Sequence, residues 1–342
     1  MSTKLVSLGK NGPLVPQLGF GTMGLTYAVY GQVASDEERF AVLDRAHELG
    51  ARNWDSSDLY GDGEELIGKW FKRTGKRNEI FLATKFGFIK GAPGFQVDSS
   101  AEFCKKACAE SLRLLDIDCI DLYYMHHADT KIPIEQTMRA LAELQKEGKI
   151  KHIGLSAISS ATLRRAVNIA PVAAVQTDYS VFSREIENSS GTDLLATCRE
   201  LGVTVVAAMP LGRGLLTSTF AAGELAGVQD MRTKAMPRFT EDNQNANVKL
   251  VTKFKGFADK KGCTVAQLAI AWLLKQGDDI IPIPGTKRIK YLEENWASQK
   301  VQLTDEDEKE IRSFVEGEAL AGAAVPPGMA DDLMFRNTVE EA

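Results

Sequence analysis

Eight short β-rich segments alternate with amphipathic helical segments along this chain, and this alternation constrains the fold more than any other feature. The β-rich runs lie at 18–22, 51–57, 80–86, 120–126, 151–156, 173–179, 203–209 and 279–285. The spacing of apolar residues predicts helices at roughly 36–49, 63–74, 99–115, 134–147, 160–169, 191–201, 264–276 and 288–297. Each such helix can return the chain to a parallel strand.

Eight strand–helix units within about 270 residues have the size of a (β/α)8 TIM barrel. We therefore predict the α/β class, with a single barrel domain spanning residues 1–342. The segment "NGPLVPQ" predicts an N-terminal hairpin that covers the barrel floor. The loop Ser218–Asn247 after the seventh strand and the extension from Leu303 are too long for simple connections, so we expect them to shape a pocket.

The stretch "QLGFGTMG" has G-x-G-x-x-G spacing, which on a doubly wound sheet would indicate a dinucleotide site. That site requires a strand before the glycine turn and a helix that begins on the last glycine. Here two prolines precede the glycines, and the next convincing helix begins only after Ser35, an N-cap with Glu38 three residues later. The spacing therefore does not favour a doubly wound fold.

Composition excludes several classes of protein. The 342-residue chain carries a formal net charge of −5, so we expect no general affinity for nucleic acids or anionic membranes. No run approaches ~18 apolar residues and the N-terminus lacks a signal-peptide core, which predicts a cytoplasmic protein. The five cysteines are scattered, which indicates reduced thiols, and we expect Cys104 and Cys108 to be buried on one helix.

Four polar residues follow the ends of neighbouring predicted strands: Asp55, Tyr60, Lys85 and His126. In a barrel these strand ends meet at one mouth, where the chemistry takes place. Side chains alternate along a strand, so we expect Asp55, Lys85 and His126 to face the interior and His127 to point away from it. One such residue alone would more often be structural, but four together favour catalysis.

These side chains suit the reduction of a carbonyl group. Hydride addition creates an alkoxide, and a phenol can protonate it if the phenol pKa, ordinarily ~10, is lowered toward the working pH. Lys85 would stabilise the phenolate of Tyr60, and Asp55 would hold Lys85 charged, while His126 would either hydrogen-bond the substrate oxygen or share the proton relay. The hydride must come from a nicotinamide cofactor.

Two loops at the same end of the barrel are candidates for binding phosphate. In "PLGRGLLT" we expect Gly212 and Gly214 to present free N–H groups and Arg213 to bridge a pyrophosphate. In "PGTKRIKYLEEN" the cations Lys287, Arg288 and Lys290 stand where a helix N-terminus is already positive, which predicts a bound anion. The alternative is a solvated basic turn.

The chain resembles the aldo-keto reductases from about residue 14 to 297. The matching segments occur in family order and include "LGFGTMGL", "NWDSSDLYGDGEELIGKW", "LATKFG", "DLYYMHH", "IGLS", "VQTDYS", "PLGRGLLT" and "IPIPGTKRIKYLEEN", and "MPRFTEDN" resembles a branch of microbial and plant reductases. The resemblance implies NADPH-dependent reduction of aldehydes or ketones, with Asp55, Tyr60, Lys85 and His126 as the catalytic tetrad. It also implies cofactor contacts at Gly21, Thr22, Met23, Asp55, Ser156, Gln176, Pro210, Leu211, Gly212, Arg213, Gly214, Gly285, Thr286, Lys287, Tyr291, Glu294 and Asn295.

Four positions depart from the pattern of that family: His127, Ala157, Ala208 and Tyr291. They leave the tetrad intact and bear on cofactor affinity and on packing against the nicotinamide. Candidate residues for the substrate pocket are apolar or aromatic, namely Tyr27, Tyr30, Phe86, Phe88 and Met125.

Two other functions are alternatives to the reductase. One is a nicotinamide-nucleotide-binding redox sensor or channel-associated subunit with little turnover, which some relatives of similar sequence exemplify. The other is a metal-dependent barrel hydrolase, which the scarcity of clustered histidines disfavours, so we expect no metal. The expected partner is a small carbonyl compound, and self-association into a homo-oligomer is left open.

Overall fold

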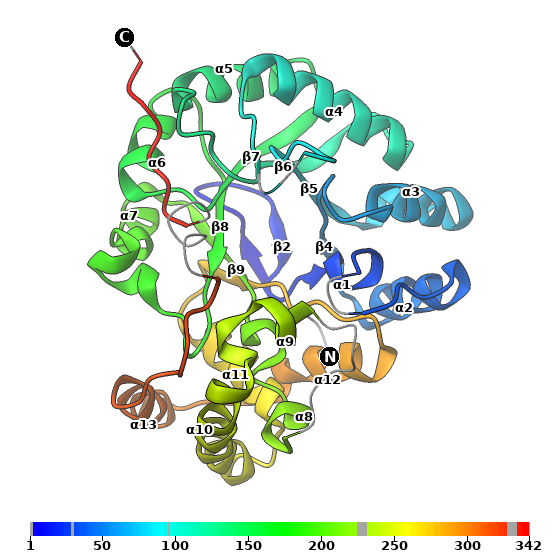
Figure 1. Ribbon diagram of the computed structural model, residues 1–342. Helices are drawn as coiled ribbons and strands as arrows, with labels where there is room; N and C mark the ends of the chain where they lie inside the picture. Colours follow the sequence, from blue (N-terminus) through cyan, green and yellow to red (C-terminus); the bar gives the residue numbers. More distant parts are fainter. Residues whose placement is uncertain are drawn as a thin grey trace.

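The computed structural model describes residues 3–28, 31–92, 94, 96–223, 231–326 and 334–341. Eight parallel strands form one sheet in the order β10-β9-β8-β7-β6-β5-β4-β3, and helices surround it (Figure 1). The strands are β3 (Phe20–Gly21), β4 (Asn53–Asp55), β5 (Phe81–Phe86), β6 (Ile120–Met125), β7 (Ile150–Ser156), β8 (Ala174–Asp178), β9 (Thr204–Ala208) and β10 (Ile280–Pro282). This confirms the predicted (β/α)8 fold.

The helices that follow the strands lie close to their predicted places. They are α2 (Asp36–Leu49), α3 (Gly63–Thr74), α4 (Ala101–Leu115), α5 (Ile134–Lys146), α6 (Ser160–Val167), α7 (Leu194–Leu201), α11 (Val265–Lys275) and α12 (Ile289–Ala297). Helix α2 begins with the expected capping box, in which Ser35 and Glu38 satisfy each other's backbone N–H groups.

Further helices occupy segments where the sequence predicted only a long loop and an extension. They are α8 (Ser218–Ala221), α9 (Met231–Ala235), α10 (Glu241–Lys260) and α13 (Asp305–Glu316), while α1 (Met23–Thr26) follows β3 directly. Short 3-10 turns are η1 (Arg77–Glu79), η2 (Glu185–Glu187), η3 (Ser189–Gly191), η4 (Gly212–Gly214), η5 (Pro237–Phe239) and η6 (Ser298–Lys300). In Figure 1, α8, α10 and α13 lie on the same side of the barrel as α11, and α10 packs against both α8 and α11.

Glycines close the barrel between its first and last strands. Gly19 N–H donates to the Pro282 carbonyl (2.9 Å), and Gly21 N–H donates to the Pro284 carbonyl (3.2 Å). A Cβ on Gly21 would lie 2.8 Å from the Ile283 carbonyl oxygen, and one on Gly285 would lie 2.7 Å from the Gly21 carbonyl oxygen. The G-x-G spacing therefore serves barrel closure, because only glycine lets the two backbones approach this closely.

The predicted alternation of side chains along the strands holds. Ala83 and Leu122, which share strand faces with Lys85 and His126, belong to the interior cluster of the barrel. Phe86 and Met125 have the opposite parity and lie in the core between sheet and helices, so their assignment to the substrate pocket is wrong. Tyr30, another pocket candidate, lies outside the described residues.

An N-terminal hairpin covers the barrel floor, as expected. Strands β1 (Leu5–Ser7) and β2 (Leu14–Pro16) pair antiparallel, and the hairpin contributes Val6, Leu8 and Val15 to the interior cluster. Gly9 N–H donates to Thr204 Oγ1 (2.7 Å) at the start of β9, so the hairpin lies at the amino ends of the strands. The opposite end of the barrel stays open for a site.

The C-terminal segment 334–341 crosses the loops after β6 and β7. Arg336 N–H donates to the Ala157 carbonyl (3.0 Å), and Val339 N–H donates to the Thr130 carbonyl (3.0 Å). In Figure 1 this segment, in red, runs beside α6. Among the described residues, no helix combines the length and the apolar character that crossing a bilayer requires.

Candidate active site

The centre of the site is Lys85, a fully buried lysine at the end of β5. Its ammonium donates to Asp55 Oδ1 (2.5 Å) and to the Ser56 carbonyl (2.7 Å). The ring of Tyr60 lies below the ammonium, with its centroid 5.0 Å from Lys85 Nζ. Neighbouring strands β4 and β5 thus bring together a carboxylate, an ammonium and a phenol, which the sequence placed at strand ends.

Electrostatic interactions keep Lys85 charged in spite of its burial. Loss of solvation lowers the pKa of Lys85, but the Asp55 carboxylate and a hydrogen bond with Tyr60 more than offset this, so the pKa lies above its usual value. Asp55 also accepts a hydrogen bond from Gln176 Nε2 at its second oxygen, Oδ2 (2.8 Å). Lys85 therefore stays protonated and fixed beside the phenol.

His126 follows β6 and faces the same site. Its ring meets the Tyr60 ring edge to face at a centroid distance of 5.8 Å, and its Nδ1 lies 3.1 Å from Ser57 Oγ. Burial, Lys85 and His127 hold the pKa of His126 well below its usual value, so the imidazole is neutral.

His127 does not point away from His126, contrary to the expectation. The two imidazole rings stack with centroids 5.3 Å apart and an interplanar angle of 27°, and both contact Phe88. Strand β6 ends at Met125, and alternation of side chains stops where the strand stops. In the described part of the chain, no three His, Cys, Asp or Glu side chains gather as they would around a metal ion.

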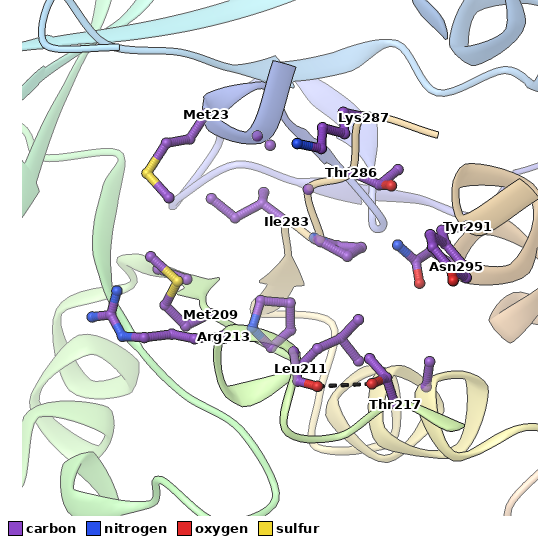
Figure 2. A pocket seen from close by; sticks show the side chains of 18 of the residues that line it. Met23, Met209, Leu211, Arg213, Thr217, Ile283, Thr286, Lys287, Tyr291 and Asn295 are labelled. Carbon is purple, nitrogen blue, oxygen red and sulfur yellow. Dashed lines mark hydrogen bonds between the residues drawn. The ribbon is translucent and has the colours of Figure 1, made fainter. Parts of the chain in front are cut away.

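A cavity of about 540 Å³ opens beside this cluster and extends to α12 (Figure 2). Asp55 and Tyr60 line it, together with the predicted cofactor contacts Gly21, Thr22, Met23, Gln176, Pro210, Leu211, Arg213, Gly214, Gly285, Thr286, Lys287, Tyr291, Glu294 and Asn295. Ser156 and Gly212, also predicted as contacts, are not among the lining residues. Lys85 and His126 are also not among the residues that line the cavity.

The loop after β9 forms one wall of the cavity, and its backbone differs from the expectation. Gly212 N–H donates to the Met209 carbonyl (2.8 Å), and Gly214 N–H donates to the Leu211 carbonyl (3.0 Å). These N–H groups are therefore engaged within η4 rather than free for a phosphate. Arg213 (φ 59°) has left-handed backbone and lines the cavity, and its Nη2 lies 3.7 Å from Asp178 Oδ2.

The opposite wall carries the basic start of α12. Arg288 occupies the N-cap of that helix without making a side-chain cap, and Lys287 precedes it. Lys287 Nζ donates to the Gln32 carbonyl (3.1 Å), while Tyr291 and Asn295 project from the helix beside it (Figure 2). Helix polarity and two cations coincide here, as the sequence indicated.

Several lining residues were missed by the sequence analysis. Arg232, on α9, donates to the Arg213 carbonyl (2.6 Å) and so adds a cation from the insert to the cavity wall. Phe220 and Phe239 also come from the insert and pack against each other with ring centroids 5.7 Å apart. The basic and aromatic residues of the insert could have indicated that it contributes to the cavity. Without a periodic pattern, however, the sequence could not show where these residues lie.

Asp58 and Glu64 are two buried acids directly behind the site that the sequence analysis did not single out. Thr84 Oγ1 donates to Glu64 Oε1 (2.6 Å), and burial raises the pKa of Glu64. Burial also raises the pKa of Asp58, to about 7, although Lys90 acts against it.

The raised pKa of Asp58 predicts a pH-dependent effect of Asp58→Asn on stability. The folded state binds this proton more tightly than the unfolded state, so wild-type stability falls as pH rises from about 4 to about 7. The variant lacks this loss and is expected to gain up to roughly 4 kcal/mol over wild type at pH 8, and little at pH 4. Urea unfolding at both pH values measures the difference; a pH-independent difference would contradict the assignment.

The barrel and its Asp–Lys–Tyr–His cluster define a class of protein. The family model described as "Aldo/keto reductase family" matches residues 17–316, and the chain belongs to this family of carbonyl oxidoreductases. A relative, aldo-keto reductase str7 of Strobilurus tenacellus, is 48% identical over 90% of this chain and 91% of its own. Another, aldo-keto reductase yakc of Schizosaccharomyces pombe, whose name specifies NADP(+), is 48% identical over 95% of both chains.

A solved structure agrees with the fold. The glycerol dehydrogenase AKR11B4 from Gluconobacter oxydans superposes with a TM-score of 0.81 at 26% identity, over 93% of this chain and 96% of that one.

Proposed function

We propose that this protein is an NADPH-dependent reductase that converts aldehydes or ketones to alcohols, with Tyr60 as the general acid. The observation that carries the proposal is the buried Lys85 ammonium, bonded to Asp55 and to Tyr60 at the edge of a large cavity. A positive charge held against a phenol stabilises the phenolate that remains after proton donation. The redox-sensing alternative gains no support from the relatives described above.

Each member of the cluster has a separate proposed part. Tyr60 donates its proton to the oxygen of the reduced carbonyl, and Lys85 stabilises the resulting negative charge. Asp55 keeps Lys85 protonated and oriented through their 2.5 Å contact. His126, neutral because of its lowered pKa, hydrogen-bonds the carbonyl oxygen through Nε2.

The side chains that line the cavity suit the phosphate groups of NADPH. Cationic side chains of Arg213, Arg232, Lys287 and Arg288 line it, as expected for a site that holds several phosphate groups. A nicotinamide cofactor held there would supply the hydride for the reduction.

The substrate side of the site is aromatic. Tyr27 lies 6.5 Å from Tyr60 between ring centroids, and Phe88 contacts His126 at 5.0 Å. These rings favour apolar or aromatic carbonyl compounds over small polar ones.

Turnover of 4-nitrobenzaldehyde with NADPH tests the proposed function directly. We expect steady oxidation of NADPH that depends on the aldehyde, followed by absorbance, and formation of the corresponding alcohol. Tight NADPH binding without turnover across a panel of aldehydes and ketones would reject the reductase.

Charge reversal at Lys287 is expected to separate NADPH from NADH. Lys287→Glu places a carboxylate where we propose the 2′-phosphate binds, so KM for NADPH should rise about 10- to 100-fold. KM for NADH, which lacks that phosphate, should change only a few-fold. Lys290→Glu is the matched control, because Lys290 belongs to the same helix start but does not line the cavity. Equal effects on the two nucleotides would discredit the assignment.

A further inference from the structure

Behind His126 lies a chain of hydrogen bonds that leads away from the cavity. His126 Nδ1 is 3.1 Å from Ser57 Oγ, and Ser57 Oγ is 3.3 Å from Asp58 Oδ1. Ser57 and Asp58 are both buried, at 1% and 7% exposure. The proposed mechanism gives neither residue a part, although both lie between Asp55 and Tyr60 in the sequence.

The hydroxyl of Ser57 can donate only one hydrogen bond. It already accepts one from the N–H group of Leu59 (3.2 Å), so it can accept one more and donate its own proton. Donation to Asp58 therefore requires that His126 donate through Nδ1–H. Donation to His126 Nδ1 requires that a protonated Asp58 donate to Ser57.

The two arrangements differ at the nitrogen of His126 that is not bonded to Ser57. A neutral imidazole carries one proton, so Nδ1–H leaves Nε2 as an acceptor, whereas a bare Nδ1 leaves Nε2–H as a donor. Only the second arrangement can donate a hydrogen bond to a carbonyl oxygen. His126 is in the required neutral state because burial, Lys85 and His127 lower its pKa.

We propose that Asp58, acting through Ser57, sets which nitrogen of His126 carries the proton and thereby whether His126 can donate to a substrate carbonyl. When Asp58 is protonated, its hydroxyl donates to Ser57, Ser57 donates to Nδ1, and Nε2–H faces the site. Loss of one proton from the chain reverses both hydrogen bonds, so that Ser57 donates to Asp58, Nδ1–H donates to Ser57, and Nε2 is left without a proton. Asp58 and Ser57 are positioning residues in this scheme, which rests on the proposed function of His126 for its catalytic consequence.

The surroundings of Asp58 place the change of the His126 tautomer near neutral pH. Burial raises the pKa of Asp58 to about 7; Lys90 and Lys85 lower it, and Glu64 raises it. Tyr123, on β6, is another titratable neighbour, and burial, followed by Cys104, Cys108, Asp58 and Glu64, raises its pKa well above the usual value, so it stays a neutral phenol. For His126 the facing groups are Lys85, His127 and the ring of Tyr60.

The tautomer can be measured without turnover. In 15N-labelled protein, the ring 15N shifts of His126, assigned with His126→Gln, distinguish the protonated nitrogen from the bare one. We expect Nε2–H at pH 5.5 and Nδ1–H at pH 8.5, with the midpoint near the pKa of Asp58. An unchanged tautomer over this range would overturn the proposal.

Three variants identify the group responsible. Asp58→Asn should fix His126 as Nε2–H at every pH, because the Asn amide N–H can donate to Ser57 as protonated Asp58 does. Ser57→Ala should remove the pH-dependent change by breaking the chain. Lys90→Met, at an exposed position, should keep the change but move its midpoint to higher pH. A change that persists in Asp58→Asn would overturn the proposal.

The catalytic consequence is read from the pH profile of aldehyde reduction. For the wild type, kcat/KM should fall about tenfold per pH unit above the midpoint, and Asp58→Asn should lose this limb while keeping its rate at pH 5.5. If the tautomer changes as expected but reduction does not follow it, the chain of hydrogen bonds stands, and the contact of His126 with the carbonyl under the proposed function is rejected.

Discussion

Tyr60→Phe is expected to lower kcat for aldehyde reduction by about 10²- to 10⁴-fold, the range that a positioned general acid contributes. The substitution removes one oxygen atom from a residue that is 8% exposed and leaves its aromatic packing in place. Without the hydroxyl, Lys85 still carries its charge because Asp55 remains 2.5 Å away, but no proton is available to the alkoxide. The loss should therefore appear in kcat rather than in folding.

Three measurements on Tyr60→Phe separate lost chemistry from lost structure. The affinity for NADPH, followed by fluorescence titration, and the unfolding midpoint should stay close to wild type. Tyr27→Phe is a matched control, because this neighbouring tyrosine lies 6.5 Å from Tyr60 between ring centroids and loses the same atom. A Tyr60→Phe enzyme that keeps more than about a tenth of the wild-type kcat would remove Tyr60 from the role of acid.

Lys85→Met is expected to affect both activity and stability. Removing the ammonium leaves the buried Asp55 carboxylate with Gln176 as its remaining side-chain donor among the described contacts, and breaking a buried pair in this way costs about 3–5 kcal/mol. Activity should fall by at least about 10²-fold as well, because the phenolate of Tyr60 loses its counter-charge.

A double variant distinguishes these two consequences of Lys85→Met. Adding Asp55→Asn removes the unpaired charge, so the double variant should recover most of the lost stability, measured by urea unfolding. It should not recover activity, because the cation that stabilises the phenolate is still missing. Recovery of both would mean that Lys85 serves folding alone, and recovery of neither stability nor activity would mean that Asp55 has another buried role.

Much of the barrel could be predicted because its signals are local. Helices α2 and α3 have the predicted bounds, since a capping box at Ser35 and a left-handed glycine at position 75 mark one end of each within a few residues. Helix α10 was not predicted, because it lies in a long insert and does not connect two consecutive strands of the barrel directly. The tetrad residues could be identified from the sequence because the spacing of residues indicates where a strand ends and which side chains share one of its faces.

The sequence by itself determined the eight-fold alternation and the polar residues at strand ends, because periodicity and parity depend on neighbours within a few positions along the chain. Only the tertiary structure decided that Gly21 and Gly285 close the barrel and that Ser57 joins His126 to Asp58. Those facts depend on atoms that meet only after packing, often from segments hundreds of residues apart, and hydrogen-bond partners across such distances leave no periodic trace in the sequence.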